Sequence, residues 1–237
     1  MACVHKFESY LNLQRLDFEP TTLIIGTFNP SWPADNTAEW FYGRTHDEHG
    51  NQNNNFWDVL PRLYGEESLI NAGPTEWKAF CRNKQIAITD LIYSIDDAEQ
   101  DNPEHETLLR SFSDKAIATK FRQHTPVEIV ELLQQYPTIQ NVFLTRGTGE
   151  TFWRRLWRPV IQFAEANNKY EARLLTPSGY AFYQHGRHNR INPHNRIDEL
   201  ADFILDAWRQ VWNFQEMEDR LVHNEQVCDR NAISGGM

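Results

Sequence analysis

Four short apolar runs recur along the chain, and each is followed by small and polar residues. They lie at residues 23–27, 86–91, 141–145 and 172–176. Each run is rich in Ile, Leu or Val and shows little alternation between apolar and polar positions, which is typical of strands covered on both faces. The pattern therefore predicts four strands of a mainly parallel sheet.

Helical periodicity separates these runs. The expected helices span residues 56–63, 76–82, 126–135, 150–166 and 197–212. In the third of them, Thr125, Pro126 and Glu128 form a capping box with proline at the first helical position. Polar segments 31–55 and 96–107 are expected to be loops. Strands that alternate with helices imply right-handed crossovers, so we predict an α/β fold, a three-layer αβα sandwich around the four-stranded sheet.

One domain accounts for this pattern. The alternation continues to about residue 215, so residues 1–215 are expected to form a single domain and 216–237 a C-terminal tail without periodicity. The chain has 237 residues, 40% of them hydrophobic. A chain of this size can bury enough apolar surface to fold without disulfides or a metal ion.

The cysteines and the N-terminus indicate a reduced, cytoplasmic protein. Cys3, Cys81 and Cys228 are far apart and show no metal-ligand spacing. The first residues lack the apolar core of a signal peptide, and no run is long enough to span a bilayer. We therefore expect a monomeric protein with no metal, no cofactor and no membrane association.

Charge is unevenly distributed along the chain. The formal net charge of -10 works against non-specific nucleic-acid binding, because phosphate contacts need Lys and Arg. Residues 96–106 are acidic, whereas residues 176–196 contain three Arg, three His and no acid. A local basic face of this kind can still bind a polyanion.

The residues that follow the four predicted strands are candidates for a site. Ligands of open parallel sheets bind beyond the carboxyl ends of the strands. Here those ends lead into segments 26–30, 89–90, 145–149 and 176–179, all rich in small and polar residues. We expect these segments to converge on one crevice.

The first two motifs carry an amide and an aromatic ring. In LIIGTFNPSWP, Gly26 permits a tight turn and Asn29 projects a neutral amide, unless Asn29 only caps a neighbouring backbone group. In WFYG, Tyr42 offers a flat face on which a base could stack, or packs in the core. In NNNFW, the asparagines that include Asn54 could be polar site residues or could cap the helix that follows.

The third motif, TPSGYAFYQHGRHNRI, combines donors with basic groups. Ser178 and Gly179 offer hydroxyl and backbone donors, and Tyr180 could act as a wedge. Arg187 and Arg190 could hold phosphates. The alternative interpretation is a solvated basic loop.

Together the motifs resemble the uracil-DNA glycosylase superfamily over roughly residues 20–210, closest to its mismatch-specific and hypoxanthine-type branches. The matching residues are Gly26, Asn29, Pro30, Tyr42, Gly43, Asn54, Phe56, Trp57, Pro177, Ser178 and Gly179. Two residues separate Gly26 from Asn29 where the family has one, and Thr176 stands where the family has His or Asn. No carboxylate occupies the family's water-activating position.

The resemblance implies hydrolysis of the N-glycosidic bond of a deaminated or mismatched base, uracil or hypoxanthine, flipped out of DNA. It implies catalytic roles for Asn29 and Asn54, base-binding roles for Phe28, Tyr42 and Thr176, and phosphate-binding roles for Ser178, Gly179, Arg187 and Arg190. Because fold does not fix function, two alternatives remain. One is a catalytically weak or inactive nucleic-acid or nucleotide-binding module, and the other is an interaction protein with a vestigial crevice.

Overall fold

A central sheet of four parallel strands organises the molecule. The computed structural model gives the strand order β3-β2-β6-β7. The strands are β2 (Thr22–Gly26), β3 (Ile86–Asp90), β6 (Asn141–Leu144) and β7 (Tyr170–Arg173). This confirms the predicted parallel sheet and its four strands, although β7 begins and ends earlier than expected.

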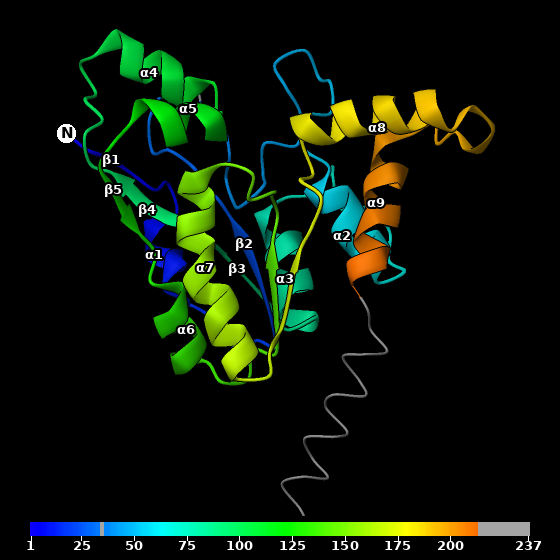
Figure 1. Ribbon diagram of the computed structural model, residues 1–237, viewed down its shortest axis with the longest axis horizontal. Coiled ribbons are helices and arrows are strands. Elements are labelled where there is room, and N and C mark those ends of the chain that lie inside the picture. The colour runs from blue at the N-terminus through cyan, green and yellow to red at the C-terminus, as the bar shows by residue number, and fades with distance from the viewer. Residues whose placement is uncertain (34–35, 213–237) are drawn as a thin grey trace, which may run out of the picture.

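Helices cover both faces of this sheet, as a three-layer sandwich requires (Figure 1). Successive strand residues point to opposite faces, so Ile24 joins one buried cluster while Leu23 and Ile25 join the other. Helices α6 (Ile129–Gln135) and α7 (Thr151–Ala166) pack in the cluster of Leu23 and Ile25. The opposite cluster includes side chains of α2 (Phe56–Leu63), α3 (Pro74–Asn83) and α9 (Leu200–Val211). Each large apolar side chain buried in either cluster contributes about 1.5–3 kcal/mol.

A second, antiparallel sheet was not predicted. Its order is β1-β4-β5, from β1 (Cys3–Val4), β4 (Ile92–Ile95) and β5 (His124–Pro126). The predicted capping box at Thr125–Glu128 is wrong, because Thr125 and Pro126 belong to strand β5. Thr125 Oγ1 instead donates a hydrogen bond to Asp96 Oδ2 at 2.8 Å, and the helix starts only at Ile129. Long-range strand pairing has overridden the local capping signal.

Helices also form where loops or unassigned segments were expected. Helix α4 (Pro103–Arg110) begins inside the predicted loop 96–107, because Asn102 Oδ1 accepts hydrogen bonds from the first turn. The third motif is not a loop but helix α8 (Gly179–Ile191). The remaining helices are α1 (Glu8–Leu11), α5 (Asp114–Lys120) and the 3-10 helix η1 (Pro193–Asn195).

The structure describes residues 1–33 and 36–212. The predicted tail, residues 216–237, and Cys228 lie outside these ranges. Among the described residues, no helix is long and apolar enough to cross a membrane. Cys3 and Cys81 are buried free thiols.

Candidate active site

A cavity of about 750 Å³ lies at the carboxyl edge of the parallel sheet. All four predicted strand-end segments contribute to its lining, as do the first residues of α5 and α8. In Figure 1, α4 and α5 lie on one side of this edge and α8 on the other. The volume is in the usual range of small-molecule pockets.

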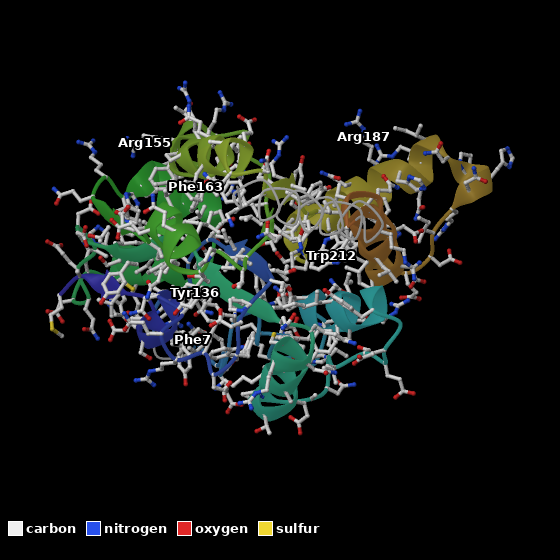
Figure 2. All side chains as sticks on the ribbon, turned by 90° about the horizontal axis from the view of Figure 1, so that it is seen from below. Phe7, Tyr136, Arg155, Phe163, Arg187 and Trp212 are labelled. Atoms are coloured by element: carbon white, nitrogen blue, oxygen red, sulfur yellow. The ribbon has the colours of Figure 1, made fainter. Side chains whose placement is uncertain are left out.

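Most of the residues that the sequence singled out line this cavity. They are Phe28, Asn29, Tyr42, Asn54, Thr176, Ser178 and Gly179. Arg187 and Arg190 do not, because they are exposed on α8 and lie about 12 and 16 Å along the helix from Gly179, at 1.5 Å per residue. In Figure 2 the Arg187 side chain projects outward from α8. Helix formation thus carries both arginines away from the cavity lining.

The hydrogen bonds of Asn29 determine what it can offer a ligand. Its Oδ1 accepts a hydrogen bond from Asn36 Nδ2 at 2.5 Å. The orientation of Asn36 is fixed in turn, because its Oδ1 accepts from the Ala38 backbone N–H at 3.2 Å. The Asn29 oxygen therefore already accepts one hydrogen bond, and its NH₂ group remains as a donor. Asn29 is better suited to bind an acceptor than to take a proton from water.

Asn54 has the capping role that was left open for this run of asparagines. Its Oδ1 accepts a hydrogen bond from the Phe56 backbone N–H at 2.9 Å, at the start of α2. The neighbouring Asn55 binds the Pro177 carbonyl through its backbone N–H at 2.8 Å and its Nδ2 at 3.1 Å. These bonds hold the third motif against the start of α2.

The two candidate stacking rings are already engaged on at least one side. Tyr42 stacks on Phe56 with ring centroids 3.8 Å apart and planes 4° from parallel. Phe28 is only 8% exposed and packs edge-on against His5, with 5.6 Å between ring centroids. Tyr42 therefore has at most one face for a base, and Phe28 offers little surface.

The Tyr42 hydroxyl is hydrogen-bonded to the Thr145 hydroxyl. The two oxygens are 2.8 Å apart, and the Thr145 hydroxyl itself donates to the Ile25 carbonyl at 3.2 Å. Burial and the nearby Asp90 charge raise the Tyr42 pKa well above its usual value, so the phenol stays neutral. Its backbone φ of 58° is strained for a bulky residue, which stacking and this hydrogen bond offset.

The cavity also contains carboxylates, to which the sequence pattern assigned no role. Asp90 ends β3, and its side chain is 8% exposed. His5 Nε2 donates to Asp90 Oδ2 at 2.7 Å, because His5 Nδ1 accepts from the Phe7 backbone N–H at 2.9 Å. Asp90 Oδ1 makes no hydrogen bond to any residue that the structure describes. The Asp90 carboxylate is thus buried and oriented by His5, and one of its two oxygens has no hydrogen-bond donor among the described residues.

Gly26 shows where the unsatisfied oxygen lies. A Cβ at this position would be 2.2 Å from Asp90 Oδ1 and 2.8 Å from the Tyr42 hydroxyl oxygen. Both oxygens therefore border the same small space beside Gly26. The carboxylate oxygen Asp90 Oδ1 presents lone pairs there. The space is suited to a hydrogen-bond donor such as water.

A second carboxylate, Asp114, enters the cavity from the start of α5. Thr27 Oγ1 donates to its Oδ1 at 2.7 Å, and Arg146 Nη1 lies 2.8 Å from its Oδ2. Burial raises the Asp114 pKa, although Arg146 opposes the shift. Arg146 also pairs with Glu150 at 2.9 Å, so the arginine is balanced by two acids.

Sequence reasoning missed most of this charged set. Asp90 was placed at a strand end but was given no chemical role, and the same holds for Arg146. Asp114 follows Ser113, whose hydroxyl caps Ala116 N–H at 3.2 Å, and this local signal could have located α5. Nothing local marks His5, which reaches the site because β1 pairs with β4. Within the described ranges, no group of three His, Cys, Asp or Glu side chains is placed to hold a metal ion.

Comparisons with known proteins give one distant likeness. No protein-family model and no curated protein matches the chain. The chain is similar to a solution NMR structure of a Methanosarcina acetivorans protein provisionally named a uracil DNA glycosylase. They share 14% identity over 84% of this chain and 94% of that chain, with a TM-score of 0.47. A likeness at this level does not show what the chain does.

Proposed function

We propose that this protein hydrolyses N-glycosidic bonds in DNA, removing a deaminated or mismatched base such as uracil or hypoxanthine. The observation that carries the proposal is the buried Asp90 carboxylate. One of its oxygens is held by His5, and the other borders a cavity of about 750 Å³ without a partner. A base that is cleaved in such a cavity has to be flipped out of the nucleic acid first.

The reaction also needs hydrogen-bond donors for the departing base, and the cavity lining offers such groups. The bond between the base and C1′ breaks with its electrons going to the base, so negative charge grows there. Asn29 offers its NH₂ group, and the first turn of α8 offers backbone N–H groups at Gly179 beside the Ser178 hydroxyl. Helix N-termini favour negative charge. These groups suit either the base or the phosphate of a flipped nucleotide.

The carboxylates supply the complementary half of the reaction. Water forms the new bond to C1′ and gives up a proton, for which Asp90 Oδ1 is the available acceptor. Asp114 has both oxygens engaged, so it contributes negative charge near the positive charge that develops on the sugar. A general base that is held in position typically contributes about 10²–10⁴-fold in rate. A hydrogen-bond donor aimed at developing negative charge contributes about 10²–10³-fold. His5 acts through Asp90 as a positioning residue.

The test is a cleavage assay on labelled oligonucleotides that carry uracil, hypoxanthine, xanthine or a mismatched base, followed by alkali to reveal abasic sites. Asp90→Asn keeps the size of the side chain but removes the proton acceptor, so we expect base release to fall about 100-fold or more. Asp206→Asn, at an exposed carboxylate of α9 paired with Arg209, is the matched control and should cleave normally. Equal rates for Asp90→Asn and wild type would refute the role of this carboxylate.

The catalytically inactive nucleic-acid or nucleotide-binding module is the second candidate. The hydrogen bond that Asn29 Oδ1 already accepts from Asn36 favours it, because it limits what this amide can offer a water molecule. Oligonucleotide binding without abasic sites on any substrate would make it the better interpretation. A monomeric state and a cytoplasmic location remain predictions.

A further inference from the structure

Helix α8 carries an unusual outward face. Ala181 is fully buried on the inner side of the helix, whereas the side chains on the outer side of the helix are open to solvent. Tyr180 and Tyr183 are 62% and 75% exposed, and Arg187 and Arg190 are exposed as well. The helix contacts mainly α9 and η1 and extends away from the sheet (Figure 1). Its outward face is therefore free of the rest of the described chain.

These four residues form one row, here named the aromatic–basic stripe. Their spacings of three, four and three residues place Tyr180, Tyr183, Arg187 and Arg190 on one side of an α-helix. At 1.5 Å per residue the stripe is about 15 Å long. It begins at the active site, because Tyr180 lines the cavity. The order along the helix is thus cavity, two aromatic rings and two guanidinium groups.

The charge of the stripe differs from that of the whole protein. Residues 176–196 contain no acid, although the chain has a net charge of -10. Neither Arg187 nor Arg190 makes an ion pair with another described residue. Two large, exposed aromatic rings beside free guanidinium groups indicate a binding surface for an anionic partner that has flat apolar faces.

We propose that the aromatic–basic stripe binds single-stranded nucleic acid, with unpaired bases stacked on Tyr180 and Tyr183 and phosphates held by Arg187 and Arg190. Base stacking on aromatic side chains tolerates any sequence, but it requires base faces that a duplex keeps covered. The strand then enters the cavity at Tyr180. This inference rests on the proposed function only for the reaction in the cavity. Binding of a strand to the aromatic–basic stripe can be measured without any catalysis.

The experiment uses the full chain and undamaged, fluorescein-labelled oligonucleotides of one length, as a single strand and as a duplex. Fluorescence anisotropy measures affinity at several salt concentrations. We expect tighter binding of the single strand, and a loss of about tenfold or more for Tyr183→Ala. Phe182→Ala is the matched control: it removes an exposed ring from the same helix, 66% exposed but off the stripe, and should bind as wild type. Thermal melts verify that both variants fold.

The arginines are tested through the salt dependence. For a single strand, each lost phosphate contact lowers the slope of log affinity against log salt by about 0.7. Arg187→Gln combined with Arg190→Gln should therefore lower the slope by about 1.4. An unchanged slope would overturn the phosphate role.

Other results would overturn the proposal as a whole. They are tighter binding of the duplex, equal losses for Tyr183→Ala and Phe182→Ala, or an oligonucleotide affinity too weak to detect. Concentration-dependent dimerisation that Tyr183→Ala abolishes would assign the stripe to a second copy of the chain instead. In contrast, strand binding that depends on Tyr183 but yields no abasic sites would defeat only the proposed glycosylase activity.

Discussion

Gly26→Ala is the most demanding test of the geometry of the candidate site, because it adds a single methyl group at the point where Asp90 and Tyr42 meet. The new Cβ would lie 2.2 Å from Asp90 Oδ1 and 2.8 Å from the Tyr42 hydroxyl oxygen. Carbon and oxygen are normally in contact at about 3.4 Å or more, so the Asp90 oxygen would have to retreat by about 1.2 Å. Asp90 cannot retreat freely, since His5 holds its other oxygen at 2.7 Å.

The structure sets the size of both expected effects. Forcing an extra methyl group into a packed site costs about 1–3 kcal/mol, and loss of a hydrogen bond to a charged group costs a similar amount. We therefore expect Gly26→Ala to lower the free energy of unfolding by about 2–4 kcal/mol. A displacement of about 1 Å at a catalytic group can also cost about 100-fold in rate.

The assay pairs denaturant unfolding with single-turnover base release on the best substrate. Gly186→Ala is the control for stability, because an added Cβ there has no neighbour within 4 Å and the position is helical. Ala is favoured over Gly in a helix, so the control should be as stable as wild type or more stable by about 0.5–1 kcal/mol. If Gly26→Ala matches wild type in both measurements, the close approach of Asp90 and Tyr42 is wrong, and with it the proposed water site.

Three further predictions address single residues. Asn54→Ala should cost about 1 kcal/mol of stability in a thermal melt and leave base release nearly unchanged, because the amide caps α2; a large loss of rate at full stability would contradict this. Burial raises the Asp114 pKa above its ordinary value of 3.8, so the stability that this carboxyl group contributes is full below pH 3.8 and is lost as pH rises through the raised pKa. The melting temperature of Asp114→Asn, taken relative to wild type, should therefore increase from pH 3.5 to neutral pH. A difference in melting temperature that stays constant with pH would refute this prediction. Burial also raises the pKa of Cys81 to about 12, so this thiol should resist alkylation at pH 8 until the protein is unfolded, and rapid labelling of the native protein would be the contrary result.

The sequence by itself determined the framework of this protein. The apolar runs predicted β2, β3 and β6 because strands buried on both faces have to be apolar, and this requirement is local. The run at 172–176 located β7 only in part, since this edge strand covers Tyr170–Arg173 and is not fully buried. Helical periodicity likewise predicted α2 with its bounds and α7 to within one residue. The position of small and polar residues after the strands predicted where a cavity would lie, since parallel strands bring their carboxyl ends to one edge.

Tertiary structure alone decided the chemistry of that cavity. Thr125 carried a helix-capping signal, yet strand pairing with β4 and the bond to Asp96 were more favourable. Asn29 was expected to be catalytic, and the fold adds that its oxygen accepts a hydrogen bond from Asn36, which no local pattern predicted. His5 lies 85 residues from Asp90 along the chain, and no local pattern could join them. A side chain's position follows from its own segment, whereas its protonation and its free lone pairs depend on neighbours that only the folded chain supplies.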